Sequence, residues 1–239
     1  MKKRASSHLE MVMAFLFFIG FTTFIFAFVK PYPPTSLTGA VVSGLENSLK
    51  KKAETNLSQI FIKIDPLPPG CNEINLDRKT FYTLSNSLVK KIKQNGKFEK
   101  IKSGIDSPPN LQIKDDSPGG QEEHLIAFIS PEFKQNNLQN CFSLDPAYIT
   151  FGSIYEKEIL SNKSLHDMKK KYYSDYKNLK KELKIPESND FSITSPDFPE
   201  INMERKIPES VEVYSKEIVV EILNSKGEII NPRMIIKVW

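Results

Sequence analysis

The sequence has few of the residues that usually carry catalysis or bind metals. Its 239 residues include two cysteines and three histidines. The local signatures GxSxG, HExxH and CxxC do not occur, and neither do the glycine-rich phosphate patterns GxGxxG and GxxxxGK. Two cysteines without a histidine pair at ligand spacing give little support to a zinc site. We therefore expect no enzyme activity, no catalytic residue, no cofactor and no metal site.

The histidines by themselves do not build a catalytic centre. His124 begins an apolar run beside Glu122 and Glu123, and His166 precedes a lysine-rich segment. Either could act as a general base, but a base also needs a nucleophile and an orienting partner, which no neighbouring motif supplies. Surface histidines are therefore the favoured interpretation.

Charge is missing from the nineteen residues 11–29, seven of which are phenylalanine. At about 1.5 Å per helical residue this run covers roughly 28 Å, close to the ~30 Å hydrocarbon core of a bilayer. It is longer than the core of a cleaved secretion signal, about 7–15 residues, and no small-residue cleavage site follows it. The sequence therefore predicts one N-terminal transmembrane anchor helix over residues 6–30.

Three cations, Lys2, Lys3 and Arg4, precede this run. Cations that flank a span resist translocation, so we expect a single-pass protein of the cell membrane. Its N-terminus would be cytoplasmic, the bulk of the chain extracytoplasmic, and the lipid bilayer a partner. Without the three cations and Glu10, the 33 basic and 29 acidic residues become 30 and 28. This near balance does not favour a nucleic-acid partner.

The string Lys2-Lys3-Arg4-Ala5, followed by Ser6-Ser7-His8-Leu9-Glu10 and the apolar run, resembles an archaeal type IV pilin leader, or class III signal peptide. The resemblance implies a cut between Ala5 and Ser6, which would release residues 1–5 as a basic leader. It also implies a prepilin-type peptidase and pilin-like subunits as partners. A plain signal anchor, with Glu10 among the lipid headgroups, is the alternative.

Cutting after Ala5 would place Glu10 at the fifth position of the mature chain, where the pilin family has a glutamate. A carboxylate at a helix start faces the positive end of the helix dipole. It could also pair with the new α-amino group of a neighbouring subunit, as an assembly carboxylate. Prolines at 31, 33 and 34 should stop the helix, which disfavours a continuous filament spine.

The remainder of the chain predicts an α+β fold, with a mixed helix and antiparallel-sheet extracytoplasmic domain. An α+β region would cover 31–185, and a C-terminal β-hairpin region would cover 186–239 as part of the same domain. Apolar spacing predicts helices over 38–55, 80–94 and 164–184, and strands over 59–64, 124–129, 218–223 and 234–239. Residues 95–123, with three prolines and a glycine pair, predict a long loop-rich insertion.

A second, looser resemblance concerns the exterior. It is carried by Tyr172-Tyr173, Asp175-Tyr176, Leu179-Lys180, Ile185-Pro186 and Asp190-Phe191, followed by the sheet-like tail. This succession resembles the exteriors of uncharacterised archaeal pilin-like membrane proteins. It implies an architecture and no activity.

Cys71 and Cys141 are candidates for one disulfide, because an even cysteine count outside the cytoplasm favours pairing. Two unpaired thiols are the alternative. Asn56 and Asn162 each begin an N-glycosylation tripeptide and are candidates for modification, although such tripeptides also arise by chance.

These observations predict a pilin-like surface protein with a structural, assembly or adhesive role. The alternative is a solitary membrane-anchored binding module, or an accessory subunit of a membrane complex, that does not form filaments. The sequence names no ligand for either.

Overall fold

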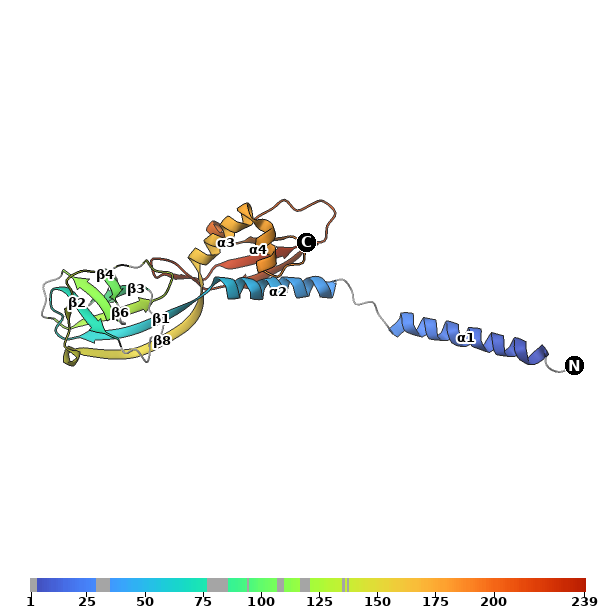
Figure 1. Cartoon of the computed structure of the whole chain (residues 1–239), viewed down its shortest axis with the longest axis horizontal. Helices are drawn as coiled ribbons and strands as arrows, with labels where there is room; N and C mark the ends of the chain where they lie inside the picture. Colours follow the sequence, from blue (N-terminus) through green and yellow to red (C-terminus); the bar gives the residue numbers. More distant parts are fainter. Residues whose placement is uncertain are drawn as a thin grey trace. The chain divides into compact units, whose positions relative to one another are not determined.

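The chain divides into two units, Met1–Val41 and Val42–Trp239. The computed structural model describes residues 4–28, 35–76, 86–93, 95–106, 110–116, 121–134, 136 and 138–239, and the side chains of the first two helices over 10–25 and from 39 onward. The helices, labelled in Figure 1, are α1 (Arg4–Phe28), α2 (Thr35–Ala53), α3 (Asn162–Ser174) and α4 (Tyr176–Glu182).

Helix α1 exposes its apolar side chains, among them Phe15, Phe17 and Phe18. The hydroxyls of Thr22 and Thr23 each donate a 2.7 Å hydrogen bond to the carbonyl four residues earlier, so the helix satisfies these groups itself.

The prediction of a transmembrane helix over residues 6–30 is wrong. In the described part of the chain, no helix is both long enough and apolar enough to cross a bilayer. The predicted proline break at 31–34 lies outside the described residues.

The second unit contains, among its described residues, a ten-stranded sheet and a three-stranded sheet. The large sheet has the order β12-β11-β8-β1-β6-β3-β4-β5-β2-β7, and the small sheet has the order β10-β13-β9. The strands are β1 (Glu54–Ile64), β2 (Gly70–Asn75), β3 (Ser87–Ile92), β4 (Phe98–Asp106), β5 (Asn110–Asp115), β6 (Glu123–Ile129), β7 (Phe142–Ser143), β8 (Ile149–Ser161), β9 (Phe191–Thr194), β10 (Tyr214–Val219), β11 (Ile222–Leu223), β12 (Ile229–Ile230) and β13 (Arg233–Val238).

The predicted fold class, α+β with an antiparallel sheet, is wrong in the proportion of strand to helix and in the direction of some strands. The protein is mostly β-sheet with four helices in the described residues. Its large sheet is mixed, because β11 runs parallel to β8 and β7 runs parallel to β2, while the other neighbours are antiparallel. Each parallel pair includes one strand of only two residues, β7 or β11, and so short a strand gives no sequence signal.

The large sheet curls around an apolar core. Along β1, Ile60, Ile62 and Ile64 are buried while Phe61 between them is exposed, as in a strand with one buried face. Their side chains form one cluster with residues of β2 to β6, including Ile74, Val89, Leu111 and Leu125. Since this cluster joins β1 to β2, which lie far apart in the strand order, the sheet must bend back on itself (Figure 1).

A second apolar cluster lies on the other face of β3. It contains Leu57, Leu88, Phe133, Ile159 and Leu223, whereas Val89, the neighbour of Leu88, belongs to the first cluster. Strand β3 is therefore buried on both faces. The helix predicted over 80–94 is wrong for this reason, because a doubly buried strand carries consecutive apolar residues that imitate helical spacing; residues 80–85 of that prediction lie outside the described residues.

The loop-rich insertion predicted over 95–123 is also wrong, because it contains β4 and β5. The prolines and glycines that suggested a loop fall between and after these strands. By contrast, the structure confirms the helix predicted over 38–55, which is α2, and the strands predicted over 59–64 and 124–129, which lie within β1 and β6.

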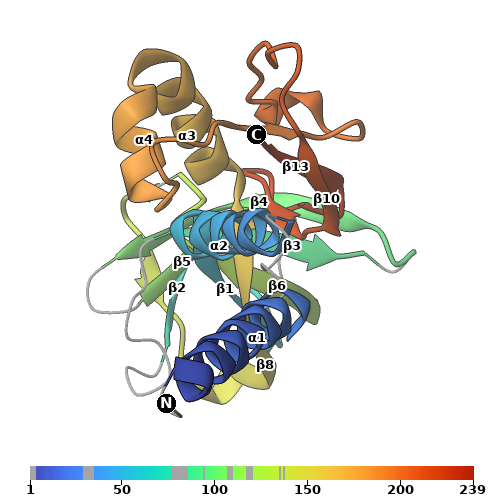
Figure 2. The same ribbon diagram turned by 90° about the vertical axis from the view of Figure 1, so that its right-hand side faces the viewer.

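Helices α3 and α4 replace the single helix predicted over 164–184 and lie beside the small sheet (Figure 2). The break is at Asp175, whose backbone leaves the helical region and whose carboxylate accepts a 2.7 Å hydrogen bond from Asn178. Asp favours such local bonds over a helix interior. The Tyr172 hydroxyl crosses to the small sheet and donates a 2.6 Å hydrogen bond to the carbonyl of Phe191.

The C-terminus is tied into the small sheet, and β13 confirms the strand predicted over 234–239. The backbone of Trp239 exchanges hydrogen bonds with that of Asp190, at 2.7 and 3.0 Å. The strand predicted over 218–223 is divided, however, because β10 ends at Val219 in the small sheet and β11 begins at Ile222 in the large one.

Candidate functional site

The predicted processing and assembly residues lie in α1. Ala5 and Ser6 lie in the first turns of α1, and their side chains are not among the described ones. Glu10 is exposed. The structure brings no other predicted site residue next to them in the described part of the first unit. Their processing and assembly roles therefore stay predictions.

The disulfide is confirmed: Cys71 on β2 is bonded to Cys141 just before β7. It joins two segments that also pair as parallel strands, Asn72 opposite Phe142 and Glu73 opposite Ser143. The covalent link and the ladder together hold the edge of the large sheet.

The two glycosylation candidates differ in their surroundings. Asn56 is an exposed residue of β1, opposite Glu158 of β8. Asn162 is the first residue of α3 and is half-buried, and its side-chain oxygen is buried without a hydrogen-bond partner in the described residues. Of the two, Asn56 is the more open to a bulky modification.

Each of the two histidines in the second unit lies beside a glutamate. His124 Nε2 lies 3.0 Å from Glu122 and its side chain is exposed, whereas His166 Nε2 lies 3.7 Å from Glu200 and its residue is half-buried. The described residues contain no group of three or more His, Cys, Asp or Glu side chains that could hold a metal ion.

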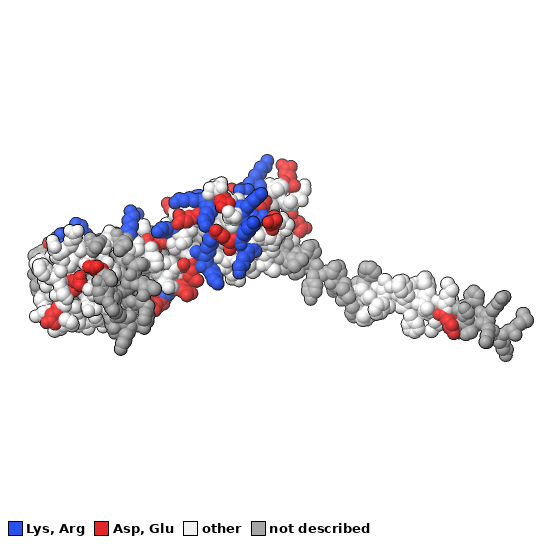
Figure 3. Space-filling model, in the orientation of Figure 1, with Lys and Arg blue, Asp and Glu red and all other residues white. Residues whose placement is uncertain are grey.

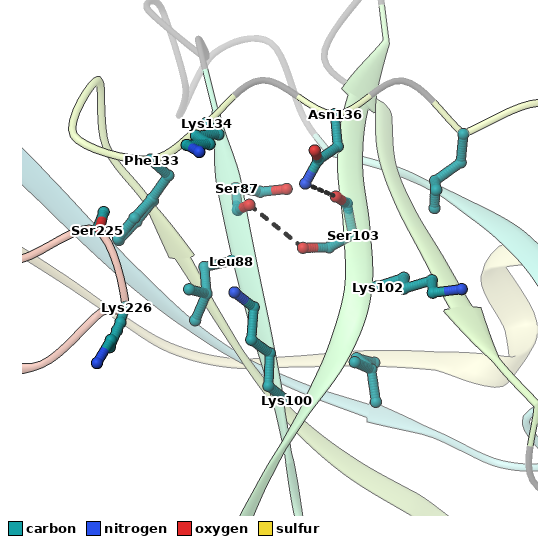
Figure 4. Close-up of a pocket in the computed structure, with 12 residues that line it drawn as sticks. Ser87, Leu88, Lys100, Lys102, Ser103, Phe133, Lys134, Asn136, Ser225 and Lys226 are labelled. Carbon is teal, nitrogen blue, oxygen red and sulfur yellow. Dashed lines mark hydrogen bonds between the residues drawn. The ribbon is translucent and has the colours of Figure 1, made fainter.

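A pocket of about 860 Å³ lies where β4 leaves β3. We call it the lysine pocket, because four of its lining residues are lysines (Figure 4). It is lined by Ser87, Leu88, Lys100, Ile101, Lys102, Ser103, Phe133, Lys134, Asn136, Leu138, Ser225 and Lys226. None of these described lining residues is acidic.

A bend in β4 creates the pocket. Up to Ile101 the strand pairs with β3, and from Lys102 onward it pairs with β5. At the change of partner, the Ser103 hydroxyl accepts a 3.2 Å hydrogen bond from the N–H of Val89 and donates a 3.3 Å bond to the carbonyl of Ser87. A side chain thus replaces the missing backbone ladder.

The next wall of the pocket is the segment after β6, which carries Phe133, Lys134 and Asn136. The Asn136 amide donates a 3.3 Å hydrogen bond to the carbonyl of Ser103. A side chain at the neighbouring Gly104 would collide with the carbonyl oxygen of Asn136, so only glycine permits this approach.

Buried Glu132 anchors the same segment at the start of α3. Its carboxylate accepts a hydrogen bond from the hydroxyl of Ser161, the N-cap of α3, and a 3.1 Å bond from the backbone N–H of Lys163. Burial raises the pKa of Glu132 above its usual value, and these hydrogen bonds only partly oppose the effect.

The third wall is the turn between β11 and β12, which carries Ser225 and Lys226. Gly227 adopts a positive φ of 72° there and lies against Leu88 of β3. Lys90 donates a 3.1 Å hydrogen bond to the carbonyl of Gly227, which fixes the turn to the sheet. The residues Asn224, Ser225, Lys226 and Gly227 are typical turn formers.

Half-buried Lys91 on β3 has the carboxylate partners that the exposed pocket lysines lack. Lys91 points to the opposite face of β3, between Asp115 at 3.1 Å and Glu123 at 2.7 Å. Burial lowers its pKa, but the hydrogen bonds that Lys91 donates to Glu123 and Asp115, together with the charges of these carboxylates, outweigh that effect and raise the pKa above its usual value. The pocket lysines have no such ion pair with a carboxylate in the described residues.

No pattern in the sequence predicted the lysine pocket. Its residues come from four segments, and two of its lysines, Lys100 and Lys102, lie in residues that were interpreted as a loop. Their spacing of two was the available signal, because on a strand it places both side chains on one face. No protein-family model, curated protein or solved structure matches the chain.

Proposed function

We propose that the protein is a pilin-like assembly subunit of the cell exterior, which acts by binding other copies of itself through α1. The observation that carries this proposal is the exposed apolar surface of α1, which appears almost entirely uncharged over its described residues in Figure 3.

The exposed side chains surround the helix. At 100° per residue, Phe15, Leu16, Phe17 and Phe18 alone point in four different directions, and they are 58–71% exposed. A helix that is apolar all round needs apolar contact on every side, which one amphipathic face of a single domain does not provide. Several neighbouring copies of the same helix would supply it.

Glu10 gives such a bundle its register. It is the only acidic residue among the described side chains 10–25 of α1. If residues 1–5 are removed, a neighbouring chain offers an α-amino group at Ser6, and an ion pair surrounded by apolar side chains specifies position more than it adds stability. The Cys71–Cys141 disulfide supports the exterior location, because such bonds persist in oxidising compartments.

The proposal is tested on the protein isolated from its native cells. We expect its intact mass to lack residues 1–5, and the Glu10→Ala variant to lose cross-linked multimers that Glu209→Ala retains. Glu209 is an exposed carboxylate far along the chain, so its replacement controls for the change in charge. A chain that begins at Met1 or Lys2 contradicts the processing, and normal multimers of Glu10→Ala contradict the assembly role.

A second candidate function is that of a binding module, or of an accessory subunit, whose second unit recognises a ligand. The lysine pocket favours it, because unpaired cations around a cavity are typical of a binding site.

A further inference from the structure

We propose that the lysine pocket binds a small ligand that carries more than one phosphate or sulfate group. This inference goes beyond assembly through α1 and does not depend on it, because every lining residue belongs to the second unit.

The first argument is the charge of the pocket. Lys100, Lys102, Lys134 and Lys226 come from β4, from the segment after β6 and from the β11–β12 turn, and all four are exposed. No ion pair joins any of them to a carboxylate in the described residues. Four like charges around one cavity repel each other, and an anionic ligand removes that repulsion.

The second argument is a buried hydroxyl without a partner. Ser87 is 4% exposed, and its Oγ makes no hydrogen bond in the described residues, although a buried polar atom normally has one. Ser103 and Asn136 beside it are both bonded. In Figure 4 the Ser87 hydroxyl points toward Asn136, at the end of the pocket near Lys134. An oxyanion there would accept the hydrogen bond that Ser87 lacks.

The third argument concerns the type of cation. All four are lysines, and none of the lining residues is an arginine. Lysine binds phosphate as a point charge, whereas the arginine fork binds carboxylate and phosphate alike through two parallel hydrogen bonds. Four lysines are therefore compatible with phosphate or sulfate, and their number favours a ligand with several negative charges.

The size of the pocket indicates that the ligand carries more than one phosphate or sulfate group. A volume of about 860 Å³ lies near the upper end of the range for small-molecule sites, roughly 300–1,000 Å³. A single inorganic phosphate would fill little of it and reach few of the lysines. An oligophosphate or a sulfated disaccharide can contact lysines on two walls at once.

The test is calorimetric titration of the full chain at low ionic strength, first with inorganic tripolyphosphate and then with a heparin-derived sulfated disaccharide. Both probes carry several oxyanion groups. The probe that binds more tightly identifies whether the pocket prefers phosphate or sulfate. We expect tripolyphosphate, sulfated disaccharide or both to bind at a ratio of one per chain, more weakly as salt is added.

Two double variants separate the site from the net charge of the protein. Lys100→Gln with Lys226→Gln removes cations from two walls, while Lys177→Gln with Lys181→Gln removes two exposed cations of α4. The pocket pair should lose about a hundredfold in affinity, since each of the two charge-assisted hydrogen bonds lost weakens binding by about tenfold. The α4 pair should bind as the wild type does.

Ser87→Ala gives a third measurement that does not change charge. We expect it to fold normally and to lose about threefold to tenfold in affinity, the range for one hydrogen bond. The proposal is overturned if neither probe binds the wild type, if the two lysine pairs lose affinity equally, or if the folded pocket variants bind unchanged. None of these results affects the proposed role of α1.

Discussion

The hydroxyl of Ser103 takes the place of a backbone carbonyl for Val89, accepting its N–H at 3.2 Å where β4 leaves β3 for β5. This bond lets β4 bend without leaving a buried N–H unpaired. The bend also opens the floor of the lysine pocket. One serine thus connects the curl of the sheet to the cavity where β4 leaves β3.

Ser103→Ala should destabilise the protein, whereas Ser87→Ala should not. Removing the Ser103 hydroxyl leaves the N–H of Val89 buried without a partner, which costs about 1–3 kcal/mol of the free energy of unfolding. The Ser87 hydroxyl has no partner to lose in the described residues. Urea denaturation measures both changes, and an equal loss in the two variants contradicts the role given to Ser103.

Gly104→Ala should weaken both the fold and the binding of tripolyphosphate. The added methyl group would collide with the carbonyl oxygen of Asn136, so the segment that carries Lys134 must shift. Gly44→Ala is the matched control, since its new methyl group meets no atom within 4 Å. Because Gly44 lies inside α2, that substitution should stabilise the protein by about 0.5–1 kcal/mol. Thermal melting compares the two, and a tolerated Gly104→Ala would count against the close approach.

Glu132→Gln should change how stability depends on pH. Burial raises the pKa of Glu132 in the folded protein, so its contribution to stability is fully present below about pH 4.5, its value in the unfolded chain, and falls as the pH rises through the folded value. The difference in unfolding free energy between wild type and Glu132→Gln should therefore decrease as the pH rises from about 4.5.

Glu46→Gln should change the pH dependence of stability in the opposite direction. Hydrogen bonds from Lys216 and Lys50 lower the pKa of Glu46, so its contribution is present above about pH 4.5 and is lost as the pH falls through the folded value. Denaturation series from acid to neutral pH measure both variants against the wild type. Slopes of the same sign would show that one of the two environments is wrongly assigned.

Replacing both cysteines by serine should lower the free energy of unfolding by about 4 kcal/mol in the chain-entropy model, because the bond closes a loop with a sequence separation of 70. The edge strands β2 and β7 should lose hydrogen-exchange protection first, since the bond lies between them. If β1 and β6 lost hydrogen-exchange protection before β2 and β7, the result would contradict the role of the disulfide in holding β7.

Some features could be predicted from sequence because their causes are local. The strands around Ile62 and Ile126, the helix with Leu45 and Leu49, and the turn at Gly227 follow from apolar period or from turn chemistry. The cysteine pairing followed from the even count and the expected compartment. For Leu88 and Val89 the same reasoning failed, because a pattern does not reveal that both faces of a strand will be covered.

The sequence by itself determined the N-terminal apolar helix and the Cys71–Cys141 pair, because each depends on neighbouring residues or on composition. Only the tertiary structure decided the mixed ten-stranded sheet and the lysine pocket. The pocket lysines are up to 126 positions apart, from Lys100 to Lys226, and become neighbours only when β4 bends and the β11–β12 turn docks on Leu88. Such an arrangement depends on contacts distant in the chain, which no local pattern contains.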